Sequence, residues 1–349
     1  MATLKEIAQL CNVSPSTVSN ILNGKTNVSD QTRQKVMNTI TKLEYQPNFF
    51  AQSMRKQNSH IIAIITEDLN EFSSAPIVGA IMEYCERYGY KTILMNLRLY
   101  HRWNDTWYEN TERIKTILQP VIREILSFRA DGLLYVSGHC RIIHNVFDDL
   151  TIPAVFAYGI SSHSKYPSII FDDEKGAYDI TKYIISKGHS KLGLIGGSAD
   201  NLHTKSRLIG YQRALFESNI LYNPLWTRYG NWRRESGYHE AQYLIENGVT
   251  AIFCMNDNMA AGAYDYIYEK QLSVGKDISI TGYDNKEIAD YMRPGLTTAE
   301  IPLHDIGTKS AETLLKMLAS NPAKAEDFGI LRLPCKMIER ESVYKVPSS

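Results

Sequence analysis

The feature that most restricts the fold is an alternation of short apolar runs with helical patterns, which begins at residue 61. The runs are continuously apolar, which is typical of parallel strands buried on both faces of a sheet. The predicted strands are Ile61–Ile65, Thr92–Met95, Gly132–Val136, Ala154–Ala157, Ser168–Phe171, Leu192–Ile195, Ala251–Met255 and Ile278–Gly282. The helices predicted between them are Ile77–Tyr88, Arg113–Phe128, Tyr178–Lys187, Arg207–Ser218, Glu235–Asn247, Met259–Lys270 and Asp305–Ala319. This order predicts a doubly wound α/β fold with parallel sheets.

The two halves of this region resemble each other. The strand, loop and helix of residues 61–88 recur at residues 192–218, and Ala130–Val136 has a counterpart in Val249–Met255. The repetition indicates two similar lobes. Ligands of open α/β sheets bind outside the carboxyl ends of the strands, so we expect a ligand site in a cleft between the lobes.

The amino-terminal stretch has a different pattern, that of two short helices joined by a tight turn. Thr3 and Glu6 have the spacing of a capping box at the start of the first helix. Asn12 tolerates the left-handed backbone with which that helix can end, and Ser14 is placed to cap the second. The residues expected to face inward are Leu4, Ile7, Ala8, Cys11, Val18, Ile21, Leu22, Val36, Ile40 and Leu43, the last three from a third helix over Ser29–Leu43.

Two helices joined in this way form a helix-turn-helix, whose second helix can lie in the major groove of DNA. Residues 1–59 contain seven Lys and Arg against three Asp and Glu, whereas the whole chain has 38 of each. A basic region on a neutral chain indicates phosphate binding. The helix pattern alone also fits a three-helix domain with no role in DNA binding. Residues 48–56 fit either a short helix that folds on DNA or a plain linker.

The composition excludes several classes of protein. A chain of 349 residues with 44% hydrophobic residues is long enough for two or three compact units. We find neither a long apolar run typical of a membrane span nor a secretory signal, so we expect a cytoplasmic protein with no membrane partner. The five cysteines are widely spaced, which predicts reduced core thiols and no metal site.

The motifs of common enzymes are also missing. Gly196-Gly197 follows a predicted strand, but neither phosphate-loop motif nor a nucleophile elbow is present. The scattered histidines are interpreted as solvated or helix-end residues; these are His139, His144, His189 and His203. The sequence therefore predicts no enzymatic activity, no catalytic residues and no cofactor.

Taken together, the motifs resemble those of the lactose-repressor (LacI/GalR) family of bacterial transcription regulators over nearly the whole chain. The matching stretches are LKEIAQLCNVSPSTVSNILNG, YQPN, NFFAQSM, YPSIIFDDEKGA, KGHSKLGLIGG, SRLIGYQRAL, ESGYHEA, TAIFCMNDNMAAGA, DISITGYDN and GLTTAEIP. The resemblance implies a homodimer whose affinity for operator DNA is set by a small effector, and a core similar to periplasmic sugar-binding proteins. The implied parts are a headpiece (1–47), a hinge helix and linker (48–60), an N-terminal lobe (61–158 and 286–318) and a C-terminal lobe (159–285 and 319–349).

By position, the resemblance implies which residues contact DNA or brace the headpiece. These are Thr3, Ser14, Pro15, Ser16, Thr17, Ser19, Asn20, Asn23, Asn27, Ser29, Thr32, Tyr45, Asn48, Ala51, Gln52 and Met54. Pro15, Ser16 and Asn20 stand where the family reads bases. Proline and serine cannot make bidentate base contacts, so we expect readout to depend on Asn20 and on DNA shape. Met54 occupies the position of the hinge leucine that family members insert into the minor groove.

The resemblance also implies an effector site. Its residues are Phe72, Ser73, Ser137, Tyr158, Phe171, Arg207, Trp232, Asn256, Asp257 and Asp284. Arginine and carboxylates pair with hydroxyls, and tryptophan packs on the apolar side of a sugar ring, so this set suits a polyol. Each position also has a structural alternative: Trp232 as a core residue, Asp257 as the N-cap of the next helix and Arg207 as a surface cation.

The core departs from the family pattern at one residue and in one loop. Tyr158 stands where sugar-responsive relatives often carry an aspartate, which weakens the usual recognition of a hydroxyl there. Residues 97–110 form a loop that is longer and more aromatic than is usual in the family, and we expect it to contact either the ligand or the other subunit.

The leading prediction is therefore a DNA-binding repressor with a sugar-like effector. A regulator that uses a non-sugar ligand or a corepressor has the same architecture with the opposite sign, and the sequence leaves that sign open. A solute-capture protein of a transporter shares the two-lobed core. It is less favoured because it needs an export signal where this chain has a basic headpiece.

Overall fold

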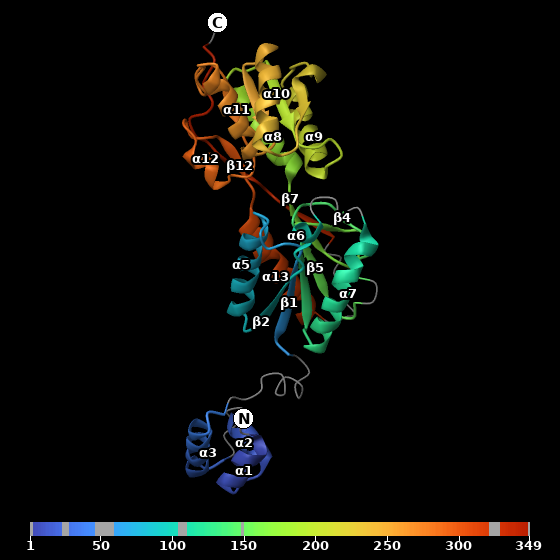
Figure 1. Ribbon diagram of the computed structural model, residues 1–349, viewed down its shortest axis with the longest axis vertical. Coiled ribbons are helices and arrows are strands. Elements are labelled where there is room, and N and C mark those ends of the chain that lie inside the picture. Colours follow the sequence, from blue (N-terminus) through green and yellow to red (C-terminus); the bar gives the residue numbers. More distant parts are fainter. Residues whose placement is uncertain are drawn as a thin grey trace. The chain divides into compact units, whose positions relative to one another are not determined.

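The computed structural model describes residues 3–22, 28–45, 59–103, 110–147, 150–320 and 329–347. The chain divides into two compact units, residues 1–59 and residues 60–349 (Figure 1). Each unit is described by itself below. None of the helices in the described ranges is long and apolar enough to cross a membrane.

The first unit contains α1 (Leu4–Cys11), α2 (Pro15–Leu22) and α3 (Asp30–Lys42). The predicted capping box is confirmed: the Thr3 amide donates to Glu6 Oε2 at 2.7 Å, and the Glu6 amide donates to Thr3 Oγ1 at 3.3 Å. Asn12 ends α1 with a left-handed backbone, φ 55°. The Thr17 amide donates to Ser14 Oγ at 3.1 Å, so Ser14 caps α2 as predicted.

The core of this unit is made by the inward faces of the three helices. Its buried members are Ile7, Ala8, Cys11, Val18, Ile21, Val36 and Ile40. Leu4 and Leu22 pack against this cluster while partly buried. The prediction for Leu43 is wrong: it lies at the C-terminal cap of α3 and is exposed, because the helix ends before a further inward turn.

The second unit begins with a six-stranded parallel sheet in the order β13-β7-β5-β3-β1-β2. Its strands are β1 (Ile61–Thr66), β2 (Lys91–Asn96), β3 (Gly132–Val136), β5 (Ala154–Ala157), β7 (Ser168–Phe171) and β13 (Ile330–Leu333). The helices associated with it are α5 (Ser74–Arg87), α6 (Leu99–Trp103), α7 (Thr111–Ser127) and α13 (Leu303–Ala319).

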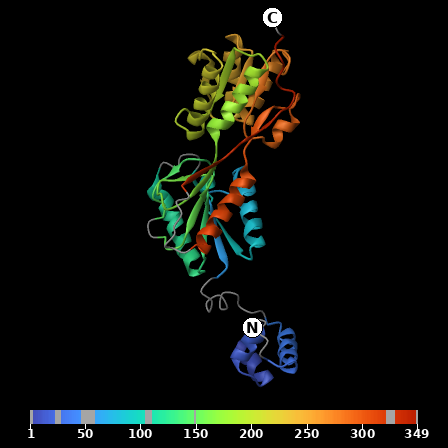
Figure 2. The same cartoon turned by 180° about the vertical axis from the view of Figure 1, so that it is seen from behind.

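Helices cover both faces of this sheet, as predicted from its continuously apolar strands. Alternate residues of β1 point to opposite sides. Ile62 and Ile64 belong to one core cluster, together with apolar residues of α5 and α13. Ile61 and Ile65 belong to a second cluster, with apolar residues of α7. Figure 1 shows α7 flanking the sheet, and Figure 2 shows α13 and α5 across its other face.

A second parallel sheet has the order β11-β10-β8-β9. Its strands are β8 (Leu192–Gly196), β9 (Thr227–Tyr229), β10 (Ala251–Cys254) and β11 (Ser279–Thr281). The helices around it are α8 (Asp173–Ser186), α9 (Leu202–Glu217), α10 (Arg234–Glu246), α11 (Asp257–Glu269), α12 (Glu287–Tyr291) and the 3₁₀ turn η2 (Pro224–Trp226). Gly262 lets α11 lie directly against α10, because a Cβ there would overlap the Arg234 carbonyl oxygen.

The six-stranded sheet contains two strands that lie outside the residue ranges predicted for the N-terminal lobe. The family resemblance assigns residues 159–285 and 319–349 to the C-terminal lobe, yet β7 and β13 from these ranges pair in the six-stranded sheet. The physical reason is that ladder hydrogen bonding continues past β5, which the apolar runs do not reveal. Two small sheets complete the unit: antiparallel β12 (Thr298–Glu300) with β14 (Lys336–Ile338), and parallel β4 (Ile142–Ile143) with β6 (Ile160–Ser161).

Candidate functional site

A cavity of about 800 Å³ lies in the second unit, at the carboxyl ends of strands from both large sheets. Phe72 follows β1, residues 138–142 follow β3 and Tyr158 follows β5. From the other sheet, residues 198–205 follow β8 and Asn256 follows β10. This is the position expected for a ligand site in two facing α/β lobes.

The structure brings six of the ten predicted effector residues to the wall of this cavity. They are Phe72, Tyr158, Arg207, Trp232, Asn256 and Asp284. The other four are buried behind the wall; they are Ser73, Ser137, Phe171 and Asp257. Ser73 Oγ donates to the Gly138 carbonyl at 3.0 Å. Phe171 stacks on His203, with ring centroids 5.5 Å apart. These four therefore shape the cavity from behind.

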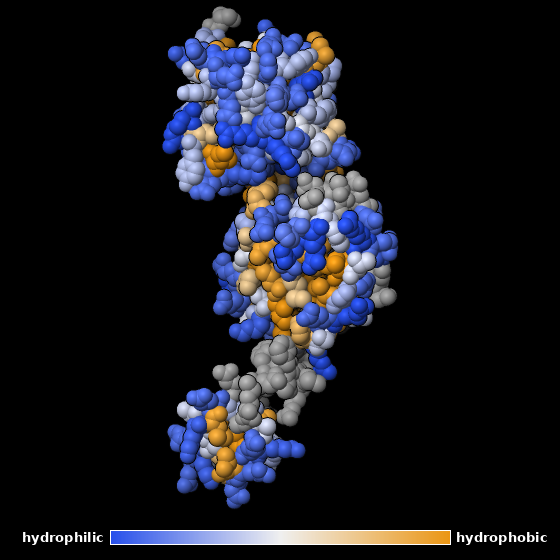
Figure 3. Space-filling model, in the orientation of Figure 1, coloured by the Kyte–Doolittle hydropathy of each residue, from blue (hydrophilic) through white to orange (hydrophobic). Residues whose placement is uncertain are grey.

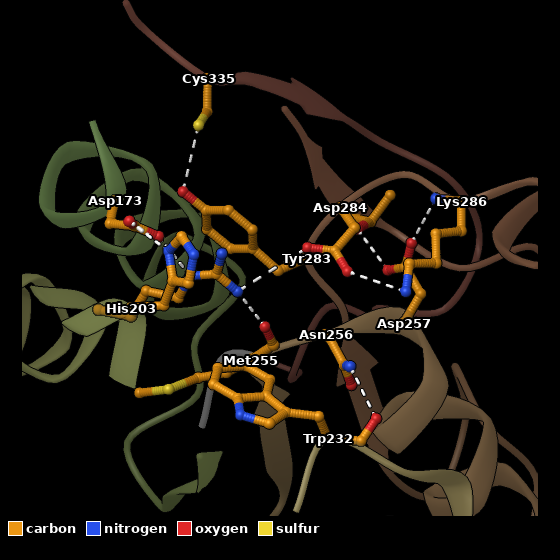
Figure 4. A network of polar contacts seen from close by, with 12 residues as sticks. Asp173, His203, Trp232, Met255, Asn256, Asp257, Tyr283, Asp284, Lys286 and Cys335 are labelled. Atoms are coloured by element: carbon orange, nitrogen blue, oxygen red, sulfur yellow. Dashed lines mark hydrogen bonds and ion pairs between the residues drawn. The ribbon is translucent and has the colours of Figure 1, made fainter. Parts of the chain in front are cut away.

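Arg207 is a buried cation held by several partners. Its side chain is only 2% exposed, so the alternative of a surface cation is wrong. Its Nε donates to Asp173 Oδ1 at 2.6 Å, and its Nη1 donates to the Met255 carbonyl (Figure 4). The guanidinium carbon lies 3.7 Å from the centroid of the Tyr283 ring. These contacts fix the guanidinium in one orientation at the cavity wall.

Asp173, in the first turn of α8, holds two side chains of the wall at once. Besides Arg207, it binds His203, whose Nδ1 lies 2.7 Å from Asp173 Oδ2. The Cys140 amide donates to His203 Nε2 at 3.3 Å, so the ring proton lies on Nδ1 and points to Asp173. Burial alone would raise the pKa of Asp173, but its interactions with His203 and Arg207 outweigh burial and bring the pKa below its ordinary value.

Two further carboxylates, those of Asp284 and Asp257, lie on the side of Arg207 away from Asp173 (Figure 4). Asp284 Oδ1 is 3.9 Å from Arg207 Nη1, and Asp284 Oδ2 is 3.5 Å from Lys286 Nζ. Asp257 accepts the Lys286 amide and the Thr298 hydroxyl, both at 2.6 Å (Figure 4). Burial, together with the charge of Asp284, raises the pKa of Asp257 to about 7. Burial likewise raises the pKa of Asp284 against the opposing charges of Lys286 and Arg207.

Trp232 and Asn256 are fixed by local structure. A Cβ at Gly197 would overlap the Trp232 ring, so glycine is required there for the indole to pack closely. Asn256 Nδ2 donates to the Trp232 carbonyl at 2.9 Å, and Asn256 Oδ1 accepts the Met259 amide at 2.8 Å. Asn256 is therefore the N-cap of α11, and the alternative role of Asp257 as that cap is wrong. Trp232 lines the cavity while packing partly on the core.

The other candidate site is the polar face of α2 in the first unit. Ser14, Pro15 and Ser16 are exposed, while Thr17, Ser19 and Asn20 are half-buried. Val18 and Ile21 lie on the buried face, as predicted. A short hydrogen-bonded cluster joins the hydroxyls of Ser14, Ser16 and Thr17, with oxygen separations of 2.6 and 2.8 Å from Ser14.

The remaining predicted DNA-contacting residues fall into two groups. Ser29 caps α3 by accepting the Thr32 amide at 3.4 Å, and Tyr45 packs against the small core. Thr3 is exposed, with its side chain engaged in the capping box. The residues outside the described ranges are Asn23, Asn27, Asn48, Ala51, Gln52 and Met54, together with the predicted hinge helix.

Comparisons with known proteins follow this division of the chain. Residues 3–48 match the family described as bacterial regulatory proteins, lacI family, and residues 181–343 match a periplasmic binding protein-like domain. The ribose operon repressor of Haemophilus influenzae is 32% identical over 348 residues, which cover 99% of this chain and 100% of that protein. The chain belongs to the lacI family of bacterial regulatory proteins.

Two further relatives support the same assignment. The HTH-type transcriptional repressor PurR of Vibrio vulnificus is 31% identical over 352 residues, covering 99% of this chain and 100% of that protein. The crystal structure of the lac repressor dimer bound to operator and the anti-inducer ONPF superposes with a TM-score of 0.79 at 28% identity, covering 98% of this chain and 99% of that one. This lacI-family chain is thus a DNA-binding transcription regulator with a two-lobed α/β core.

Sequence reasoning missed several residues of this lacI-family cleft. They are Glu67, His139, Arg141, Asp173, His203 and Lys286. Glu67, Asp173 and Lys286 each follow a predicted strand by a few residues, and a charged residue at that position was the available signal. The sequence predicts that the histidines are solvated or helix-end residues. His189 and His203 are buried and hydrogen-bonded, so neither is solvated, while His203 does lie in the first turn of α9.

His139 is also part of the wall. It is hydrogen-bonded to the Tyr100 hydroxyl, and burial and the charge of Arg141 lower the pKa of His139 to about 3. The loop over residues 97–110 thus contributes Tyr100 to the cavity, while residues 104–109 lie outside the described ranges. The five cysteines are free thiols. Within the described ranges, no three His, Cys, Asp or Glu side chains are grouped so that they could hold a metal ion.

Proposed function

We propose that this lacI-family regulator is a repressor that reads operator DNA with α2 and changes its affinity when a sugar-like effector binds in the cleft. The observation that carries the proposal is the wall of the cavity. There a fixed guanidinium, a carboxylate and an indole, those of Arg207, Asp284 and Trp232, converge at the carboxyl ends of the strands.

The chemistry of this wall suits a ring with several hydroxyls. Arg207 donates, the Asp284 carboxylate accepts, and both are held by neighbours before any ligand arrives. Such preorganisation lowers the entropic cost of binding. Trp232 provides an apolar surface for the carbon face of the ring. The relative from Haemophilus influenzae is named for ribose, so D-ribose is the first ligand to test.

A purine-like ligand is the second candidate. Phe72, Tyr158 and Trp232 place three aromatic rings on the wall, and one relative is the repressor PurR. A thermal-shift screen of the full chain against sugars, sugar phosphates, nucleosides and purine bases separates the two. A ligand that binds only the folded state must raise its melting temperature. Stabilisation by purines and not by sugars would contradict the sugar-like effector. We expect no turnover of any ligand.

Operator recognition should depend on Asn20. We expect Asn20→Ala to weaken binding to an operator selected from a random DNA library by about 1–3 kcal/mol, because an amide can pair bidentately with a base edge. Binding to nonspecific DNA should change little, and wild-type affinity should fall steeply with salt. Fluorescence anisotropy measures both affinities. Gln31→Ala, an exposed residue of α3, is the control. Equal losses on specific and nonspecific DNA would contradict base reading by Asn20.

We further propose that the regulator is a homodimer, as the lac repressor is in its operator complex. Two apolar surfaces of the second unit support this. The edge strand β2 carries the half-buried Ile93, Leu94 and Met95, and Figure 3 shows an apolar area between α5 and α7, where Figure 1 draws β1 and β2. A groove beside α11 and α12 is lined mostly by apolar and aromatic side chains, among them Tyr264 and Tyr268, together with the charged residues Arg234, Asp265 and Arg293. Exposed apolar patches of this kind mark interaction sites.

The groove provides the test of dimerisation. Tyr268 is 85% exposed in the single chain, and we expect Tyr268→Asp to weaken the dimer at least tenfold, because it places a charge in an apolar interface. Sedimentation equilibrium measures the dissociation constant. Phe216 on α9 is 82% exposed outside the groove, so Phe216→Asp is the matched control and should leave the dimer unchanged. Equal effects of the two substitutions would argue against this interface.

A further inference from the structure

Glu67 is a fully buried carboxylate directly after β1, and it accepts five hydrogen bonds. Tyr135 Oη donates to it at 2.8 Å, Ser137 Oγ at 3.1 Å and the Gly138 amide at 2.8 Å. Arg141 donates twice, from Nη1 at 3.0 Å and from Nη2 at 2.6 Å. Burial alone would raise the pKa of Glu67, but the charge and hydrogen bonds of Arg141 outweigh burial and lower it. Glu67 is therefore an anion held beneath the cleft.

Arg141 is the partner of Glu67 that reaches the ligand cavity. Its side chain lines the cavity and is 13% exposed. Both terminal nitrogens of its guanidinium bind Glu67, and Nη1 also donates to Ser137 Oγ at 2.8 Å. This bidentate geometry is the one with which arginine binds a phosphate or a carboxylate group of a ligand. Glu67 thus occupies the place that an anionic group of a ligand would take on Arg141.

On the opposite wall of the cavity, the positive charges are likewise paired with carboxylates. The Arg207 guanidinium is bound by Asp173 at 2.6 Å, and Lys286 lies 3.5 Å from Asp284. Two more cations, Lys205 and Arg233, line the cavity as exposed residues. In the buried part of the cavity, a phosphate would meet Arg141, Arg207 and Lys286, which already have carboxylate partners. It would have to displace one of those carboxylates, or lie close to it as a like charge, and both cost binding free energy.

We propose that Glu67 is a specificity-determining residue: by occupying Arg141, it makes the cleft select an uncharged ligand and reject the phosphorylated form of the same ligand. The inference rests on the proposed function in so far as the ligand is sugar-like. It goes beyond that function by stating that the ligand is uncharged and by naming Glu67 as the residue responsible for this selectivity.

The test compares D-ribose, D-ribose 5-phosphate and inorganic phosphate on the full chain by isothermal titration calorimetry. We expect the wild type to bind D-ribose at least tenfold more tightly than its 5-phosphate. Glu67→Gln keeps the size of the side chain and removes the negative charge that the Arg141 guanidinium binds. This variant should shift the ratio at least tenfold toward the phosphate. Asp305→Asn, which removes an exposed carboxylate on α13 outside the lining of this cavity, is the control and should leave the ratio unchanged.

A second variant ties any gain to Arg141. Glu67→Gln combined with Arg141→Gln contains no buried charge from this pair, so it should fold and should lose the added affinity for phosphate. The wild-type comparison decides the inference even where the single variant fails to fold. Tighter or equal binding of the 5-phosphate by the wild type would overturn the role of Glu67, and so would a ratio that Glu67→Gln leaves unchanged.

The outcomes also separate this inference from the proposed function. Preference of the wild type for the phosphorylated sugar would leave a sugar-like effector in place and overturn only the role of Glu67. A wild type that binds neither sugar would contradict the sugar-like effector. Inorganic phosphate then decides the inference, because Glu67→Gln must bind it at least tenfold more tightly than the wild type does, and equal affinities would overturn the inference.

Discussion

Replacing Asp173 with alanine is expected to lower the free energy of unfolding by about 3–5 kcal/mol, the usual effect of removing one partner of a buried ion pair. Asp173 receives the Arg207 Nε at 2.6 Å and the His203 Nδ1 at 2.7 Å. Without this carboxylate, the buried Arg207 keeps the Met255 carbonyl, the Tyr283 ring and the more distant Asp284, of which only Asp284 is an anion. Urea denaturation followed by circular dichroism measures the loss.

The adjacent residue provides the matched control. Asp172 is the N-cap of α8 and accepts the Lys175 amide at 3.0 Å. Asp172→Ala should cost about 0.5–2 kcal/mol, the range for a lost helix cap. Asp173→Asn keeps the volume of the side chain, and we expect its cost to lie between those of the two alanine variants. Equal costs for Asp172→Ala and Asp173→Ala would show that Asp173 acts only through the end of the helix.

The fold could be predicted wherever a single segment carried its own signal. The eight predicted strands are confirmed. Seven of them are buried along their whole length and are mostly apolar, and β2 is half-buried at the edge of its sheet. Six strands were missed. The two-residue strands β4 and β6 are too short for a pattern, and β9, β12, β13 and β14 are short, partly exposed and carry charged or polar residues. β13 pairs with β7 across about half the chain, a contact that no local pattern encodes.

The candidate site could be predicted only in part, for a related reason. Arg207 and Trp232 were found by resemblance to a family, and the structure places both at the cavity. Asp173 and Glu67 were missed because their importance comes from partners far away in the sequence. Glu67 and Arg141 follow the neighbouring strands β1 and β3 and bind each other there, and neither residue is unusual when it is considered alone. Buried charge networks are therefore visible only once the tertiary contacts are known.

The stability of the folded chain should also depend on pH through the buried carboxyl group of Asp257. Burial and the charge of Asp284 raise the pKa of Asp257 from an ordinary value of 3.8 to about 7. The folded state therefore binds this proton more tightly than the unfolded chain does. The resulting stabilisation is complete below about pH 4 and is lost as the pH rises through 7, with up to about 4 kcal/mol at stake for a shift of this size.

Asp257→Asn isolates this contribution, because asparagine resembles the protonated acid. Its oxygen can still accept the Lys286 amide, and its amide group can donate to the Thr298 hydroxyl, which replaces the two present hydrogen bonds. We therefore expect the difference in unfolding free energy between the variant and the wild type to move in favour of the variant from pH 5 to pH 8. Asp305→Asn alters an exposed carboxylate on α13 and should follow the wild type at every pH. Parallel curves for Asp257→Asn and the wild type would mean that Asp257 titrates like an ordinary surface aspartate, because only a proton held more tightly in the folded state produces this slope.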